Sequence, residues 1–191
     1  DYEPSGPIKS VFADTKGHWS EKYAAYLYNQ GVINGVVRND GVYFYPTDLM
    51  TRAQFAVMLT NYLGLDKIDY SHVKLPYADL DKIPNWARNA VAAMYENRVF
   101  LGKNVGGSLI FDPDAPITRA QVMTAIGRTL PKGMGAAQID FYDRGEIPDY
   151  AAEFVGILVK AKVLTGYTDG TIRPNLNVQR SEAVKMLYGL F

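Results

Sequence analysis

Thr51-Arg52-Ala53-Gln54 and Thr118-Arg119-Ala120-Gln121 are the same four residues in the same order, 67 positions apart. A related stretch, Gln179-Arg180-Ser181-Glu182, follows the second copy by 61 positions. Each arginine comes six residues after a proline. A motif that returns at a nearly fixed spacing indicates an internal repeat of one supersecondary unit. We therefore expect three copies, at about residues 11–64, 76–131 and 140–191, preceded by an N-terminal tail at 1–10.

Further landmarks precede each arginine in the same order and at similar spacing. An aromatic-x-Asp pattern ends at Asp14, Asp79 and Asp143, and an aromatic residue follows at Trp19, Trp86 and Tyr150. A glycine comes sixteen residues after each of those aromatics, at Gly35, Gly102 and Gly166. Between the aromatic residue and the arginine, only the distance from this glycine to the proline varies, being 11, 11 and 8 residues. The variable stretch is where we expect a loop.

Each copy is predicted to be a helix, a loop and a second helix. Apolar residues at helical spacing begin at Trp19, Trp86 and Tyr150, and a second set follows each arginine. Thr51 with Gln54 and Thr118 with Gln121 are predicted to form capping boxes at the start of the second helix. The second helix of the third copy has Gln179 in place of the threonine and needs another cap, for which Asn177 is a candidate. Gly-containing turns at 39–41, 106–107 and 169–170 favour short hairpins, and 64–76 and 131–139 are expected to be linkers.

The repeat pattern also predicts the overall architecture. No copy can bury its own apolar stripes alone, but three copies packed on one another can. We expect a mainly α fold, in which three helix-loop-helix repeats close into one pseudo-threefold domain, residues 1–191, around a central helical bundle.

Composition excludes several classes of function. Twenty Lys and Arg balance 20 Asp and Glu in 191 residues, so the chain lacks the basic face of a nucleic-acid binder and the charge of a membrane anchor. It has no apolar run of about 18 residues, the length that predicts a transmembrane helix. No cysteine and two histidines leave almost nothing for a thiolate zinc site, a cysteine nucleophile or a histidine triad. We expect a binding protein, not an enzyme, with no cofactor and no metal.

The repeated arginines allow two explanations. Each lies in the first turn of a predicted helix, where the helix dipole disfavours a cation. Arg52, Arg119 and Arg180 could each pair with one of the repeated aspartates. Alternatively, the arginine and the free N–H groups of the helix N-terminus could together hold an anion such as a carboxylate.

The other repeated residues also have a structural and a binding interpretation. Most of each ring at Trp19, Trp86 and Tyr150 is expected in the core, with an edge that could stack on a sugar. The three glycines could adopt positive φ or let a ligand approach the backbone. The three aspartates could order a loop or cap a helix.

The repeated residues resemble the S-layer homology (SLH) domain triplet of bacterial cell-surface proteins. The first copy carries the resemblance at Phe12-Ala13-Asp14, His18-Trp19, Gly31–Gly35, Pro46 and 51–54, and the other copies follow it over residues 11–191. Gln54 and Gln121 replace the glutamate of the family's motif, which Glu182 keeps, and Tyr150 replaces the tryptophan.

The resemblance implies a function. Members anchor proteins non-covalently to the Gram-positive cell wall by binding secondary cell wall polysaccharide, often ending in pyruvylated N-acetylmannosamine, in grooves between repeats. It implies an extracellular location at the cell wall or S-layer. The repeat count itself predicts a monomeric pseudo-trimer as an isolated fragment. The implied ligand-binding residues are Asp14, Trp19, Gly35, Arg52, Asp79, Trp86, Gly102, Arg119, Asp143, Tyr150, Gly166 and Arg180. The alternative is a protein–protein assembly module of the cell surface layer.

Overall fold

The computed structural model describes residues 10–190, so the predicted tail at 1–10 lies almost wholly outside it. The first repeat holds α1 (Glu21–Asn29), β1 (Val36–Arg38), β2 (Gly41–Tyr43) and α2 (Arg52–Tyr62). The second holds η1 (Leu80–Lys82), α3 (Asn85–Glu96), β3 (Lys103–Val105), β4 (Ser108–Ile110) and α4 (Arg119–Thr129). The third holds η2 (Arg144–Glu146), α5 (Asp149–Lys160) and α6 (Arg180–Tyr188). Within this range, the helices are too short and too polar to cross a membrane.

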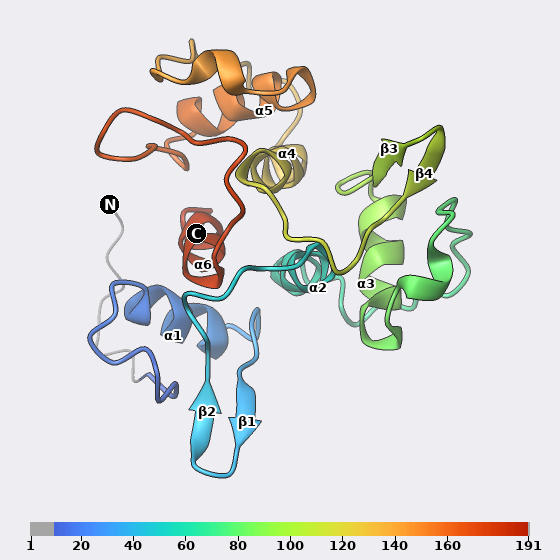
Figure 1. Cartoon of the computed structure of the whole chain (residues 1–191), viewed down its shortest axis with the longest axis vertical. Coiled ribbons are helices and arrows are strands. Elements are labelled where there is room, and N and C mark those ends of the chain that lie inside the picture. The colour runs from blue at the N-terminus through green and yellow to red at the C-terminus, as the bar shows by residue number, and fades with distance from the viewer. Residues whose placement is uncertain (1–9, 191) are drawn as a thin grey trace.

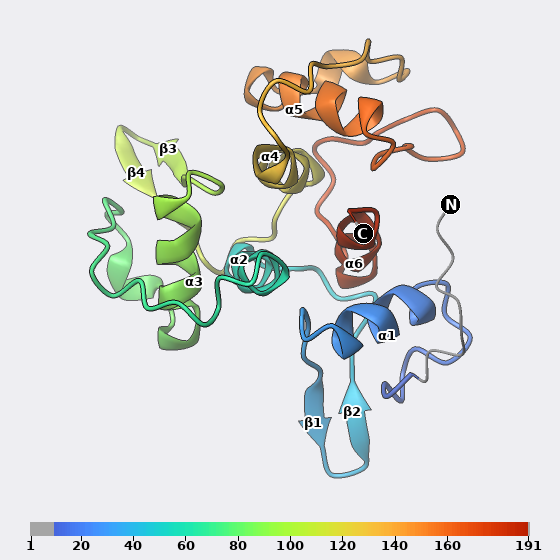
Figure 2. The same cartoon turned by 180° about the vertical axis from the view of Figure 1, so that it is seen from behind.

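The second helix of every repeat lies at the centre of the molecule. Figure 1 shows α2, α4 and α6 nearly end-on in the middle, with α1, α3 and α5 around them, and Figure 2 shows the same arrangement from behind. Each central helix packs against the first helix of another repeat: α2 on α3, α4 on α5 and α6 on α1. The last pair brings the rings of Tyr23 and Tyr26 edge-on to Tyr188, at 5.0 and 5.1 Å between centroids.

One continuous hydrophobic core connects the three repeats. The apolar residues predicted for the second helices supply fully buried members, among them Phe55, Val122 and Leu187. The segments just before the central helices are joined to one another by isolated β-bridges, which pair Leu49 with Gln179, Thr51 with Pro116 and Thr118 with Asn177. The mainly helical class and the three helix-loop-helix repeats are therefore confirmed.

Two of the three predicted helix caps have the expected geometry. The Thr51 hydroxyl accepts the N–H of Gln54 at 3.2 Å, and Gln54 Oε1 accepts the N–H of Thr51 at 3.1 Å. The same capping box opens α4. The third prediction was wrong: the residue before α6 is Gln179, not Asn177, and its N–H donates to Glu182 Oε2 at 3.0 Å.

The loops differ between repeats as their lengths require. β1 pairs with β2 and β3 with β4 as antiparallel hairpins. No strand is described in the third loop, where Tyr167 N–H donates to the Thr171 carbonyl at 2.8 Å. That loop is three residues shorter than the other two, which removes the length needed for a pair of strands.

The two segments expected to be linkers are packed onto helices. Tyr70 is buried, and its N–H donates to the side chain of Asn89 on α3 at 2.8 Å. The Ala137 N–H donates to the carbonyl of Gly156 on α5 at 3.0 Å. These segments extend the surface that covers α3 and α5.

The close approach of α4 and α5 depends on Gly127. A Cβ at this position would lie 2.7 Å from the Cβ of Phe154, which is too close without a shift of the helices. We expect Gly127→Ala to lower the free energy of unfolding by about 1–2 kcal/mol, because overpacking exceeds the gain in helix propensity.

Urea denaturation measures this change. Gly145→Ala is the matched control, since Gly145 has open space around its Cβ position and needs no positive φ. Equal stability of the two variants would show that α4 and α5 can separate at little cost.

Candidate functional site

The three repeated aspartates hold the loop before each central helix. Both carboxylate oxygens of Asp79 accept backbone N–H groups, from Phe111 at 2.8 Å and Asp112 at 2.7 Å. Asp14 and Asp143 make the same pair of contacts in their own repeats, at 2.6–2.9 Å. The second donor always has positive φ, 57° at Asp112, a conformation that is unfavourable for a residue with a side chain. These contacts match the loop-ordering interpretation of the aspartates.

Each repeated arginine reaches the clamped loop of the next repeat. Arg52 Nε donates to the carbonyl of Phe111 at 2.7 Å, and Arg119 Nε donates to that of Ile172 at 2.8 Å. Arg180 Nε donates to the carbonyl of Phe44 in the first repeat at 2.7 Å. The expected direct pairing of arginine with aspartate was wrong, because one loop residue stands between them.

The N-termini of the central helices are not free to bind an anion. The N–H groups of Arg52 and Ala53 donate to the carbonyls of Ala115 and Pro113, both at 3.0 Å. The first two N–H groups of α4 and α6 are occupied in the same way by carbonyls of a neighbouring repeat, and the capping boxes occupy the third in α2 and α4. The expectation that free helix N–H groups assist the arginine was therefore wrong. An anion beside a motif arginine therefore cannot use the first N–H groups of these helices.

The repeated glycines lie under the aromatic ring of the aromatic-x-Asp pattern. At Gly102, φ is +80°, and a Cβ would lie 2.6 Å from the Tyr77 ring and 2.7 Å from the Ile110 carbonyl. Gly166 has the same relation to Phe141, and Gly35 lies against Phe12 without needing positive φ. Close packing by itself therefore requires a glycine here.

The repeated aromatics are largely outside the core. Trp19 is 50% exposed, Trp86 60% and Tyr150 51%. The expectation that most of each ring is buried was wrong, because these residues lie at the start of the outer helices: Trp19 two residues before α1, and Trp86 and Tyr150 in the first turns of α3 and α5. At least half of each side chain is available to a ligand.

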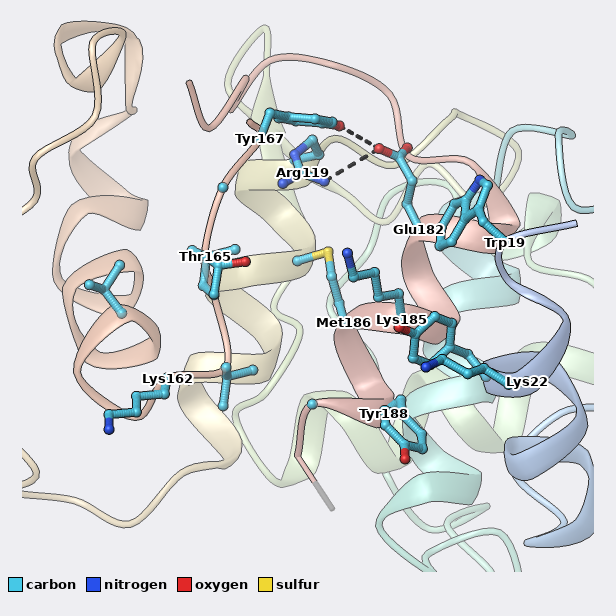
Figure 3. A pocket seen from close by; sticks show the side chains of 16 residues that line it. Trp19, Lys22, Arg119, Lys162, Thr165, Tyr167, Glu182, Lys185, Met186 and Tyr188 are labelled. Carbon is cyan, nitrogen blue, oxygen red and sulfur yellow. Dashed lines mark hydrogen bonds and ion pairs between the residues drawn. The ribbon is translucent and has the colours of Figure 1, made fainter. Parts of the chain in front are cut away.

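One cavity of about 820 Å³ collects predicted residues from all three repeats. We call it the Arg119 groove; its lining includes Trp19, Arg119, Gly166, Tyr167, Glu182 and Lys185. Figure 3 shows Tyr167 and Arg119 together at Glu182, with Trp19 on the first-repeat side. The Tyr167 hydroxyl donates to Glu182 Oε1, and Arg119 Nη1 lies 3.5 Å from the same oxygen.

A second cavity, of about 320 Å³, has the equivalent composition. We call it the Arg52 groove; its lining includes Arg52, Gly102, Lys103, Gln121, Arg128 and Tyr150. Arginine, glycine loop and exposed aromatic again come from three successive repeats. Arg52 is 1% exposed, and burial lowers its pKa to about 10, so it is still a cation at neutral pH.

Six of the twelve predicted residues thus line the two grooves. They are Trp19, Gly166 and Arg119 in one, and Tyr150, Gly102 and Arg52 in the other. Gly35, Trp86 and Arg180 form the third set by the same repeat spacing and lie outside these two cavities. Asp14, Asp79 and Asp143 also lie outside them and act on the loops.

Comparison of the three repeats with one another missed groove residues that occur in one repeat only. Arg128 and Lys103 line the Arg52 groove, and Tyr167 and Lys185 line the Arg119 groove. Burial and the hydrogen bond to Glu182 raise the pKa of Tyr167 to about 12. A search for residues shared by the three repeats cannot find these residues, because the equivalent positions of the other repeats hold other residue types.

The aspartate clamp makes a testable prediction. Asp79→Ala leaves two backbone N–H groups without acceptors and should lower the free energy of unfolding by about 2–4 kcal/mol. Asp81→Ala, at an exposed position in the adjacent 3-10 helix, is the control and should change it little. Denaturant titration of both variants measures the difference, and equal stability would show that the loop holds its shape without the clamp.

Comparison with known proteins agrees with this organisation. An endoglucanase of Bacillus sp. (strain KSM-635) is 33% identical over 182 residues, 92% of this chain but 18% of that protein. Cell surface glycoprotein 1 of Acetivibrio thermocellus is 31% identical over 92% of the chain and 7% of its own length. A cellulosome-anchoring protein of the same species is 30% identical over 77% of the chain and 33% of its own length. The chain therefore corresponds to a small part of each of these larger proteins.

The S-layer homology domain family matches the chain three times. The matches cover residues 11–56, 76–123 and 140–184, which are the three repeats found from the spacing of the arginines. They contain the aspartates, glycines, exposed aromatics and arginines described above. The chain belongs to the S-layer homology domain family.

Proposed function

We propose that this chain anchors its protein to the bacterial cell wall by binding a secondary cell wall polysaccharide in the grooves between repeats. The main support for this proposal is that two grooves each combine a motif arginine, a glycine loop and a half-exposed aromatic ring from three different repeats. Membership of the S-layer homology family supports a cell-surface anchoring module in bacteria. A Gram-positive cell wall is the location we propose.

The proposed ligand is a terminal pyruvylated N-acetylmannosamine. Its ketal carboxylate is an anion, and a guanidinium offers paired N–H donors to such a group. Trp19 and Tyr150 would stack on a sugar face. The ligand-binding set we propose is the twelve repeated residues, with the aspartates acting through the loops they hold.

We further propose that residues 1–191 form one closed, monomeric domain with pseudo-threefold symmetry. The packing of α6 on α1 and the hydrogen bond from Arg180 to Phe44 support this, since both join the third repeat to the first. The relatives that are enzymes match only over a small share of their length, which supports a non-catalytic role for the shared segment.

Calorimetric titration with purified wall polysaccharide, pyruvylated and depyruvylated, tests the ligand. Binding of the pyruvylated form alone is the expected result. Equal binding of both forms would contradict the carboxylate and leave the sugar rings as the recognised feature. Binding of neither, together with binding of a surface-layer protein, would favour the alternative of an assembly module.

The exposed aromatics make a second prediction. Trp19→Ala should weaken polysaccharide binding about tenfold, since stacking contributes on the order of 1 kcal/mol, while thermal unfolding stays nearly unchanged. Tyr142→Ala is the control, because Tyr142 is 86% exposed and lies outside both grooves. If the Trp19→Ala variant binds the polysaccharide as tightly as the unchanged protein, the Trp19 ring does not contact the ligand.

A further inference from the structure

We infer that the fourth residue of the repeated motif decides which groove arginine can take a carboxylate. In the Arg52 groove this residue is the neutral Gln121, and the arginine keeps an unused donor for an anionic saccharide. In the Arg119 groove it is Glu182, whose carboxylate already lies beside the arginine. The inference rests on the proposed function and adds that the two grooves, which share one architecture, differ in their affinity for a carboxylate.

Arg52 has donor capacity that the protein does not use. Its Nε donates to the Phe111 carbonyl, but its buried Nη2 has no hydrogen-bond partner among residues 10–190. The rings of Phe100 and Phe111 lie 4.5 and 5.3 Å from the guanidinium carbon. No carboxylate of the described residues lies within 4.0 Å of it. A buried guanidinium with an unused donor favours binding of an anion.

The remaining lining of the Arg52 groove reinforces this preference. Lys103 and Arg128 are cations, and no residue of the lining is acidic. Lys103 is paired with Asp112 at 2.6 Å, which leaves Arg128 as the second cation facing the groove. Arg128 Nη1 donates to the Val99 carbonyl at 3.3 Å, so its position is fixed.

Arg119 is in the opposite situation. Glu182 Oε1 lies 3.5 Å from its Nη1 and also accepts the Tyr167 hydroxyl. The equivalent of Tyr167 beside the other groove is Lys103, so that groove lacks both the acid and its tyrosine partner. A ligand carboxylate at Arg119 would lie next to the negative charge of Glu182, which repels it. The other cations of this groove include Lys162 and Lys185, which are exposed, so their attraction is weakened by salt.

Reciprocal exchange of the two residues tests the inference. Gln121→Glu and Glu182→Gln each keep the capping geometry, because both side chains already accept an N-cap N–H in this protein. We expect Gln121→Glu to bind pyruvylated wall polysaccharide about tenfold more weakly at 300 mM salt, and Glu182→Gln to bind it more tightly or at an additional site. Thermal unfolding verifies that both variants are folded.

A small probe separates this inference from the proposed function. Sodium pyruvate is titrated while the side-chain Nε–Hε signals of Arg52 and Arg119 are followed by NMR. A shift at Arg52 that Gln121→Glu abolishes, and a shift at Arg119 that appears only in Glu182→Gln, would uphold the inference even if neither polysaccharide binds. No shift at Arg52, or equal effects of the two exchanges, would overturn it. Loss of polysaccharide binding with intact pyruvate shifts would count against the proposed function alone.

Discussion

One residue in each repeat is held from both sides, and the arrangement of the repeats depends on it. The N–H of Phe111 donates to Asp79 of its own repeat, and its carbonyl accepts Arg52 of the repeat before. Phe44 and Ile172 are held in the same way. Loop shape within a repeat and contact between repeats are therefore set at the same point. This explains why aspartate and arginine recur together although they never form an ion pair with each other.

The same contact explains the unusual position of the arginines. A cation at the start of a helix is opposed by the dipole, and the first N–H groups of each central helix donate to carbonyls of a neighbouring repeat. In all three repeats the guanidinium donates to a carbonyl of another repeat and lies over an aromatic ring. The side chains of Arg52 and Arg119 also line a groove. Holding the repeats together and presenting a cation are thus two uses of one side chain.

Sequence spacing predicted the repeats, the helices and the capping boxes because each depends on residues close together in the chain. It also identified the arginines and aromatics that line the two grooves, although it wrongly placed most of each aromatic ring in the core. It could not predict that Trp19, Arg119 and Gly166 share one cavity, since the partners come from three repeats and their meeting depends on the packing of α6 on α1 and α4 on α5. The prediction of free helix N-termini was wrong for the same reason. The carbonyls that accept their N–H groups, such as those of Pro113 and Ala115, belong to another repeat.

The mixed origin of the grooves has a consequence for inheritance. The first repeat supplies Trp19 to one groove and Arg52 to the other, the second supplies Arg119 and Gly102, and the third supplies Gly166 and Tyr150. Recombination that exchanges a single repeat between related genes would therefore alter both grooves at once. The repeats can be copied one by one, but each groove is inherited only as a set of three.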